Sequence, residues 1–128
     1  MKWTFSQRSC AVLKDIHPDL ARVVRRALVL SPVDFVVIEG RRSSIRQQKL
    51  FAAGASLTRN SRHLTGHAVD IAPWISHTIP WNDWSSFECV AQAMMRAAQE
   101  LSIPLVWGGS WESFKDGPHF ELSRECYP

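Results

Sequence analysis

The sequence predicts a small α+β domain in which helices flank an antiparallel sheet of about four strands. Three observations predict it. First, 128 residues with 45% hydrophobic and 21% charged side chains fit one folded domain, spanning positions 1–128. Second, helical and strand patterns both occur, and they do not alternate as regular βαβ units. Third, apolar runs are far shorter than the roughly 20 residues that cross a bilayer, so we expect no integral membrane segment.

Helical spacing marks the N-terminal part of the chain. From Ser9 to about Ser31, apolar side chains recur at intervals of three and four residues. His17-Pro18-Asp19 interrupts this run. Because proline is well tolerated at the first position of a helix, we expect a short helix before it and a longer helix after it.

A strand, a turn and a helix are expected next. Residues 33–39 are rich in β-branched and aromatic side chains, as in a strand, and Gly40 ends the run. Residues 43–53 contain helix formers, and Gly54 stands where the C-terminus of a helix often has glycine.

The C-terminal half predicts three more strands and one long helix. Residues 67–72 alternate as in a strand, and the segment after them mixes proline, tryptophan and polar residues, as in a surface loop. Ser85 or Ser86 is expected to cap a helix that runs to about Leu101. The remaining strands are expected at residues 105–107 and 119–122.

Charge and cysteine content limit the function classes. A net charge of +3 favours a polyanionic partner, either nucleic acid or an anionic cell wall. The basic residues are scattered, so a nucleic-acid binder is not favoured. Cys10, Cys89 and Cys126 are odd in number and lack the spacing of metal-binding pairs, so we expect reduced thiols. The N-terminus lacks the apolar stretch of a secretory signal, and we expect synthesis in the cytoplasm.

The segment from Ser61 to Asp70 contains the first candidate metal ligands. His63 and Asp70 are seven residues apart, which on a continuous helix would separate them by about 10.5 Å along the axis. Zinc holds each ligand at about 2 Å, so both can bind one ion only if the chain turns back between them. Gly66 supplies a place for that turn.

Strand parity then selects among the neighbouring residues. If the chain is extended from His67, Asp70 shares one face of the strand with Ala68 and Ala72, and His67 lies on the other face. Asp70 is therefore the expected ligand, and His67 is expected to be structural.

His119 supplies a third candidate ligand from the far end of the chain. Two histidines and one carboxylate leave one position open to water, as in catalytic zinc sites, although other divalent ions accept the same ligands. Asp116 lies three residues earlier across a Gly-Pro turn, where it can act as general base and then as general acid. Glu121 would share a strand face with His119, and it is either a residue that orients His119 or an exposed carboxylate.

The six tryptophans leave more than one interpretation open. Their number suggests stacking against sugars. Trp107 and Trp111 also fit the core, whereas Trp74, Trp81 and Trp84 fit either the rim of a cleft or ordinary surface.

The paired motifs resemble a known family. Ser61-x-His63-x-x-Gly66-x-Ala68-x-Asp70, followed by Asp116-x-x-His119, is similar to the motifs of zinc peptidases of peptidoglycan. That family includes D-Ala-D-Ala carboxypeptidases and L-alanyl-D-glutamate endopeptidases. Aspartate at position 116 resembles the endopeptidase branch, which contains many phage endolysins. Further similar blocks are Ile16 to Leu20 and Glu39 to Ser43 with Gln47 and Gln48.

The resemblance implies a fold and a set of site residues. The fold would be the Hedgehog/DD-peptidase-like α+β domain, with zinc bound on its antiparallel sheet. His63, Asp70 and His119 would bind Zn²⁺, and Asp116 would be the general base and acid. Arg42 would contact the substrate and stabilise the charge that develops on the scissile carbonyl oxygen. Ser61 would be a further substrate contact.

The resemblance also implies an activity. The expected enzyme is a monomeric zinc metallopeptidase that cleaves the peptidoglycan stem peptide, as an L-alanyl-D-glutamate endopeptidase of the phage endolysin type. From this function we expect bacteriolysis after release from the host cytoplasm to the periplasm, which would need a holin-like partner or membrane damage. The alternative enzyme is a D-Ala-D-Ala carboxypeptidase. A different class is a zinc-stabilised cell-wall binding module without catalysis.

Overall fold

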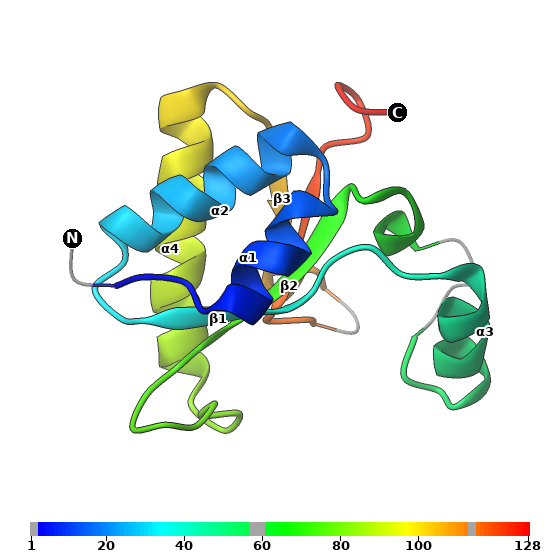
Figure 1. Ribbon diagram of the computed structural model, residues 1–128, viewed down its shortest axis with the longest axis horizontal. Coiled ribbons are helices and arrows are strands. Elements are labelled where there is room, and N and C mark those ends of the chain that lie inside the picture. The colour runs from blue at the N-terminus through cyan, green and yellow to red at the C-terminus, as the bar shows by residue number, and fades with distance from the viewer. Residues whose placement is uncertain (1–2, 57–60, 113–114) are drawn as a thin grey trace.

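A four-stranded antiparallel sheet with the strand order β1-β2-β4-β3 lies at the centre of the fold (Figure 1). The computed structural model describes residues 3–56, 61–112 and 115–128. The predicted α+β class and the four expected strands are confirmed. The strands are β1 (Phe35–Glu39), β2 (Ala68–Pro73), β3 (Leu105–Trp107) and β4 (His119–Leu122).

The helices begin and end close to where the sequence predicts them. Helix α1 (Gln7–Lys14) is capped by Ser6, whose hydroxyl accepts from the backbone N–H of Ser9. Helix α2 (Pro18–Leu30) has proline at its first position, and the Nδ1 atom of His17 accepts from the N–H of Asp19. The other helices are α3 (Ser44–Ala52), α4 (Trp84–Leu101) and the short 3₁₀ helices η1 (Arg62–Thr65) and η2 (Gly108–Ser110).

The start of α4 differs from the prediction. The helix begins at Trp84 with Asp83 at its N-cap position, so the expected cap at Ser85 or Ser86 is wrong. Both serine side chains instead donate hydrogen bonds to Asp83. The hydroxyl of Ser85 donates to Oδ1 of Asp83 at 2.6 Å, and that of Ser86 donates to the carbonyl of Asp83 at 2.8 Å.

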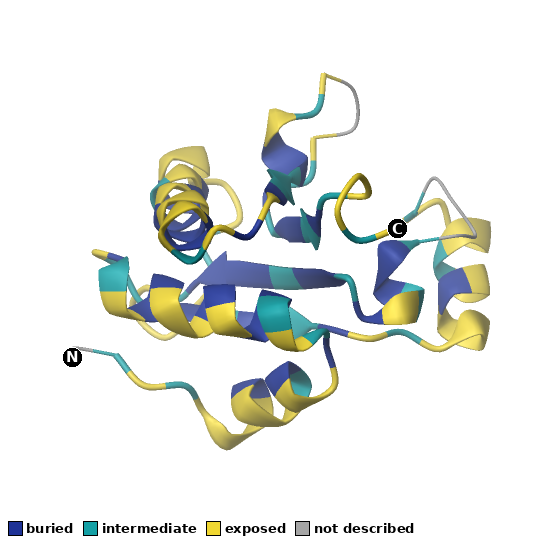
Figure 2. Cartoon of the chain, turned by 90° about the horizontal axis from the view of Figure 1, so that it is seen from above, coloured by how far each residue is buried: buried dark blue, intermediate teal, exposed yellow. Residues whose placement is uncertain are grey.

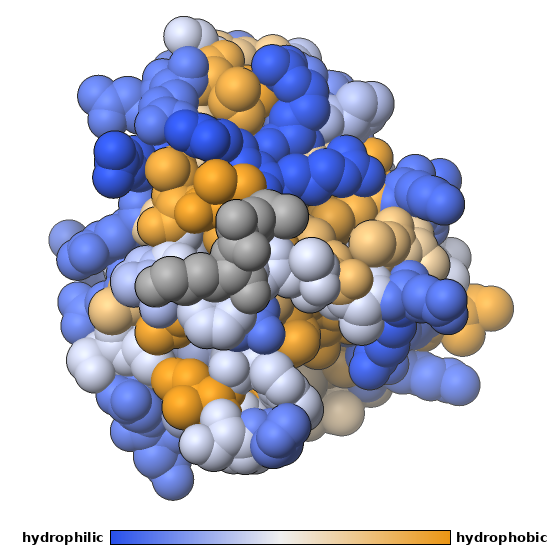
Figure 3. All heavy atoms as spheres, turned by 60° about the vertical axis from the view of Figure 1, so that its left-hand side comes forward, coloured by the Kyte–Doolittle hydropathy of each residue, from blue (hydrophilic) through white to orange (hydrophobic). Residues whose placement is uncertain are grey.

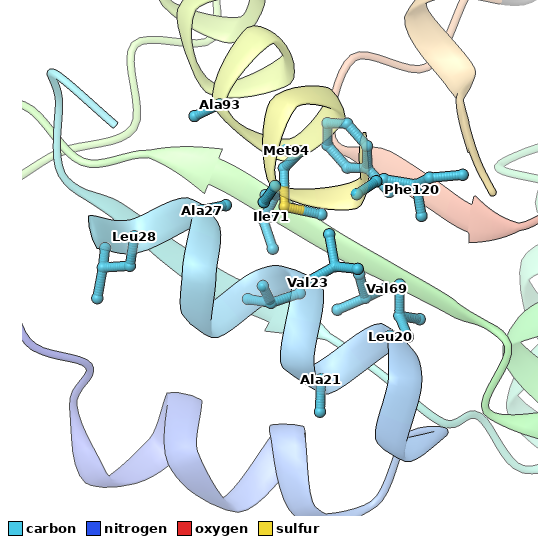
Figure 4. Packing of buried hydrophobic residues seen from close by; sticks show 14 of the residues in the cluster. Leu20, Ala21, Val23, Ala27, Leu28, Val69, Ile71, Ala93, Met94 and Phe120 are labelled. Atoms are coloured by element: carbon cyan, nitrogen blue, oxygen red, sulfur yellow. The ribbon is translucent and has the colours of Figure 1, made fainter. Parts of the chain in front are cut away.

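One face of the sheet is closed by α2 and α4, whose buried sides face inward (Figure 2). Val69 and Ile71 of β2 and Phe120 of β4 meet Val23 of α2 and Met94 of α4 in this core (Figure 4). Burying a side chain of this size contributes about 1.5–3 kcal/mol relative to exposing it. Because side chains alternate along a strand, this packing directs Asp70 to the opposite face.

The outer edge of β1 is covered by the N-terminal part of the chain. The N–H of Val37 donates to the hydroxyl of Ser9 in α1 at 3.1 Å, and Ser9 is itself buried. Helix α3 lies apart from α1, α2 and α4, on the side of the molecule away from the N-terminus (Figure 1).

No described helix is both long and apolar enough to cross a bilayer. On the face shown in Figure 3, apolar and hydrophilic side chains are interspersed. All three cysteines are free, as expected from their number.

The strand register sets the positions on which the site depends. Glu39 of β1 pairs with Asp70 of β2, and Asp70 pairs in turn with His119 of β4. The register shifts between Val37 and Glu39, as at a β-bulge, which changes the direction of the strand end. Three side chains far apart in the sequence therefore form one row across the sheet.

Gly66 makes the turn between η1 and β2, and we predict that it cannot be replaced without cost. Its φ is +76°, and an added Cβ would meet no atom closer than 3.4 Å, so the expected strain is in the backbone alone. Gly66→Ala should lower the free energy of unfolding by about 1–2 kcal/mol in urea titration. Gly54→Ala, at the same φ and in open space, is the matched control and should lose a similar amount. An unchanged urea midpoint for Gly66→Ala would contradict the need for this conformation.

Candidate metal centre

His63, Asp70 and His119 converge on one point at the face of the sheet opposite α2 and α4. Their ligand atoms all lie within 4.8 Å of one another. Nε2 of His63 lies 3.2 Å from Oδ1 of Asp70, and Nδ1 of His119 lies 3.3 Å from the same oxygen. The structure thus brings together the three residues that the sequence predicts as a cluster.

Local structure around Gly66 brings His63 to this point. Ser61 caps η1, and its hydroxyl accepts from the N–H of His63 at 3.2 Å. The left-handed conformation of Gly66 ends η1 and returns the chain to β2. His67 lies outside the cluster, with its Nδ1 atom 2.6 Å from the hydroxyl of Thr65, as strand parity predicts.

The second nitrogen of each imidazole is held by an acceptor. Nδ1 of His63 lies 2.8 Å from the carbonyl oxygen of Gly40, and Nε2 of His119 lies 2.8 Å from Oε1 of Glu121. In neutral imidazoles these bonds place the proton on the held nitrogen. Nε2 of His63 and Nδ1 of His119 are then lone-pair donors that both face Asp70.

With both imidazoles neutral, the converging atoms have no proton to share. Nε2 of His63 and Oδ1 of Asp70 are buried, and neither has a hydrogen-bond partner among the described residues. An unsatisfied buried polar atom costs about 1–3 kcal/mol, so two of them facing one another need a common partner. The donor set fits a divalent cation, because two imidazoles and a carboxylate are ordinary ligands for zinc and for several related ions.

The charges around the cluster favour a cation. Burial alone would raise the pKa of Asp70, but its contacts with His119 and His63 outweigh burial and hold the pKa far below its usual value. Burial lowers the pKa of His119, yet Asp70 and Glu121 raise it to about 9. A field that favours a proton at this position also favours a metal ion in its place.

Glu121 orients His119, which resolves the two interpretations that the sequence left open. Its side chain is only 13% exposed, and Nε of Arg62 lies 3.9 Å from its other oxygen. Its partner in the register is Ala68, which leaves space on the same face of the sheet. A carboxylate behind a metal-binding histidine fixes the ring and raises its basicity.

Asp116 lies beside the cluster without belonging to it. Its N–H donates to the carbonyl of Gly108 at 3.0 Å, and its own carbonyl accepts from the N–H of His119 at 3.2 Å. A Cβ at Gly108 would lie 2.6 Å from that carbonyl oxygen, so glycine is required for this close approach. Burial raises the pKa of Asp116, and the nearby charge of Asp70 raises it further.

Arg42 lies on the β1 side of the cluster, held by several acceptors. Its Nη2 atom donates to Oδ2 of Asp70 at 3.4 Å, its Nη1 atom donates to Oε1 of Gln47 at 2.9 Å, and its Nε atom donates to Glu39. Glu39 also accepts two bonds of 3.0 Å from Arg46 of α3. These contacts fix the guanidinium next to Asp70.

Sequence reasoning missed the supporting residues around Arg42. Gln47 is fully buried, and Glu39 pairs with both arginines, but neither was predicted to act at the site. One sequence feature could have indicated the role of Glu39. It lies at the end of a predicted strand, three residues before Arg42. The contact of Gly40 with His63 could not be predicted from the sequence, because it uses the backbone carbonyl, which every residue has.

The tryptophans divide between core and site. Trp107 packs against the core and stacks on Phe120, as one of the two interpretations expected. Trp111 is outside the core, and its ring centroid lies 5.2 Å from that of His119. Trp81 and Trp84 are exposed on the other side of the sheet, where Trp84 stacks on Trp107.

Sequence comparisons identify similar proteins. The family model described as phage L-alanyl-D-glutamate peptidase matches residues 1–124. The L-alanyl-D-glutamate peptidase of Escherichia phage T5 is 38% identical over 99% of this chain and 94% of its own length. The peptidoglycan L-alanyl-D-glutamate endopeptidase CwlK of Bacillus subtilis is 27% identical over 87% of this chain and 75% of its own length.

Solved structures of peptidases have a similar fold. The L-Ala D-Glu endopeptidase ChiX of Serratia marcescens matches 97% of this chain and 92% of its own, with a TM-score of 0.91 and 48% identity. The vancomycin-resistance D,D-dipeptidase VanXYg matches 84% of this chain and half of its own, with a TM-score of 0.58 and 18% identity. The second likeness concerns the fold alone. The resemblance inferred from the two motifs is confirmed.

The contact between Glu121 and His119 predicts a graded effect on metal binding. Glu121→Ala should weaken zinc affinity about ten- to a hundredfold in calorimetric titration, because His119 loses its orienting partner. Glu121→Gln keeps an acceptor oxygen and should lose less. Glu125→Ala, an exposed carboxylate outside the cluster, is the control and should bind zinc like the parent protein. Equal affinity in Glu121→Ala and Glu125→Ala would refute the orienting role.

Proposed function

This chain belongs to the phage L-alanyl-D-glutamate peptidase family, and from that premise we propose that it hydrolyses the bond between L-Ala and D-Glu in the stem peptide of peptidoglycan. The observation that carries the proposal is the cluster of His63, Asp70 and His119, with two buried ligand atoms that lack a partner among the described residues. The peptidase of Escherichia phage T5 and the endopeptidase ChiX of Serratia marcescens are both named for this same bond.

Zinc is the proposed cofactor, held by Nε2 of His63, Oδ1 of Asp70 and Nδ1 of His119. Bound there, zinc would polarise the scissile carbonyl and make water a stronger nucleophile at neutral pH. The two imidazoles are fixed by Gly40 and Glu121, so the donor set is organised before a metal arrives.

Asp116 is the proposed general base and acid. Its carboxyl group is close enough to the cluster for Asp70, His119 and His63 to influence its pKa, and it is not one of the converging ligand atoms. From this position its carboxylate oxygen takes a proton from the attacking water and returns it to the nitrogen of the leaving amine.

Arg42 is the proposed electrostatic partner of the substrate. A guanidinium has five N–H donors, and three of them are used by Glu39, Gln47 and Asp70. Its remaining donors on Nη1 and Nη2 can bind the carbonyl oxygen as negative charge develops on it. Ser61 is proposed as a further substrate contact, although its hydroxyl already accepts from the N–H of His63.

The proposed partner is the peptidoglycan stem peptide, and the proposed biological role is that of a phage endolysin. Relatives from Escherichia phage T5 and Listeria phage A118 support this role. We further propose that the protein acts as a monomer, and that it reaches the periplasm from the host cytoplasm through a holin or through membrane damage.

Product analysis tests the bond that is cleaved. Zinc-loaded protein should convert purified tetrapeptide muropeptides into a fragment that ends in L-Ala and a peptide that begins with D-Glu, both detected by mass spectrometry. Removing zinc with a chelator should stop the reaction, and adding zinc back should restore it. Release of free D-Ala with the L-Ala to D-Glu bond intact would instead identify the carboxypeptidase. Absence of any cleavage would favour the binding module.

If Asp116 is the general base and acid, replacing it should remove activity without releasing the metal. Asp116→Ala should retain zinc at one ion per chain by metal analysis and lose about 10²–10⁴-fold in kcat, the usual contribution of a general acid or base. Asp116→Asn keeps the size of the side chain and should be similarly inactive. A lytic rate equal to that of the parent protein would rule out this base.

A further inference from the structure

Different side chains lie on the two sides of the metal cluster. Arg42 follows β1 and contacts Asp70 from that side of the sheet. Trp111 follows β3 and lies against His119. Since β1 and β3 are the two outer strands, a cationic group and an aromatic ring flank the three ligands.

Local structure explains how Trp111 comes to lie beside His119. Trp107 turns into the core, where its indole N–H donates to the carbonyl of Gly117 at 2.7 Å. The 3₁₀ turn η2 then reverses the chain through Gly108 and Gly109. A Cβ at Gly109 would lie 2.2 Å from the ring of Trp107, so only glycine fits. The next tryptophan, Trp111, is thereby carried to the site face instead of the core.

The accessible surface of Trp111 is available to a ligand at the site. Its side chain is partly exposed and is not a member of the core cluster, although its ring contacts His119. A large aromatic ring that is left partly open beside a reacting centre provides apolar contact area together with an N–H donor.

The two ends of the proposed substrate differ in the same way as the two sides of the site. The L-Ala residue of the stem peptide is joined through a lactyl group to a muramic acid sugar, and D-Glu on the other side of the scissile bond carries a carboxylate. The positive charge of Arg42 favours the D-Glu carboxylate on its own side of the cluster, even while the free donors of Arg42 bind the scissile carbonyl oxygen. The L-Ala and sugar end is then left for the side of Trp111. One residue and a short spacer extend roughly 7 Å, so a sugar on that side reaches the ring beside His119.

We propose that Trp111 forms a subsite for the N-acetylmuramyl sugar of the substrate and thereby sets a preference for glycan-linked stem peptides over free ones. The proposal rests on the function proposed above. The flat apolar face of the pyranose packs on the indole, and the contact contributes to binding of the L-Ala side without taking part in proton transfer.

The test compares two substrates that differ in the muramyl group, which one substrate carries and the other replaces with acetyl. One is N-acetylmuramyl tetrapeptide, and the other is the same tetrapeptide with an N-terminal acetyl group. Parent protein should have the higher kcat/KM on the muramyl substrate. Trp111→Ala should reduce that value about tenfold, mainly through KM, and should change the acetyl-tetrapeptide value by less than about twofold. Trp111→Phe should restore most of the preference.

Two controls separate this role from a structural one. Trp84→Ala removes an exposed tryptophan that stacks on Trp107 on the other side of the sheet, and it should leave the ratio between the two substrates unchanged. Zinc affinity of Trp111→Ala should match that of the parent protein. Equal losses on both substrates, or a loss of zinc, would show that Trp111 only supports His119 and would overturn the subsite. Failure of the parent protein to cleave either substrate would instead refute the proposed function.

Discussion

The site depends on one oxygen atom of Asp70, at which two imidazole nitrogens are directed. Repulsion between lone pairs would separate these atoms unless a cation lay between them, so the surrounding structure has to hold them in place. Packing of Val69 and Ile71 on α2 and α4 fixes the parity of β2, and that parity turns Asp70 toward His63 and His119. The hydrophobic core and the polar site are therefore two faces of the same strand.

The supporting residues form a shell of acceptors around this point. Gly40 and Glu121 each hold one histidine, and Glu39 and Gln47 hold Arg42. None of these groups faces the substrate in the proposed mechanism. Each one restricts the rotation of a side chain that does, so less conformational entropy is lost when the substrate binds.

Much of this arrangement could be predicted from the sequence, because it follows from local rules. The position of Gly66 and the alternation along residues 67–72 were enough to select Asp70 over His67. The cap of α4 was predicted wrongly, because Asp83, Ser85 and Ser86 are all good cap residues within one turn and tertiary packing decides among them. The place of Trp111 could not be predicted, since it depends on how the two glycines of η2 reverse the chain.

The bond between Ser9 and Val37 has a consequence for how molecules of this protein meet one another. An outer strand with unsatisfied N–H groups can recruit a strand from another molecule and so start polymerisation. Here the hydroxyl of a buried serine already occupies the N–H of Val37, and α1 lies along the strand. At high protein concentration, the edge of β1 is therefore not available to pair with a strand of another molecule and start aggregation.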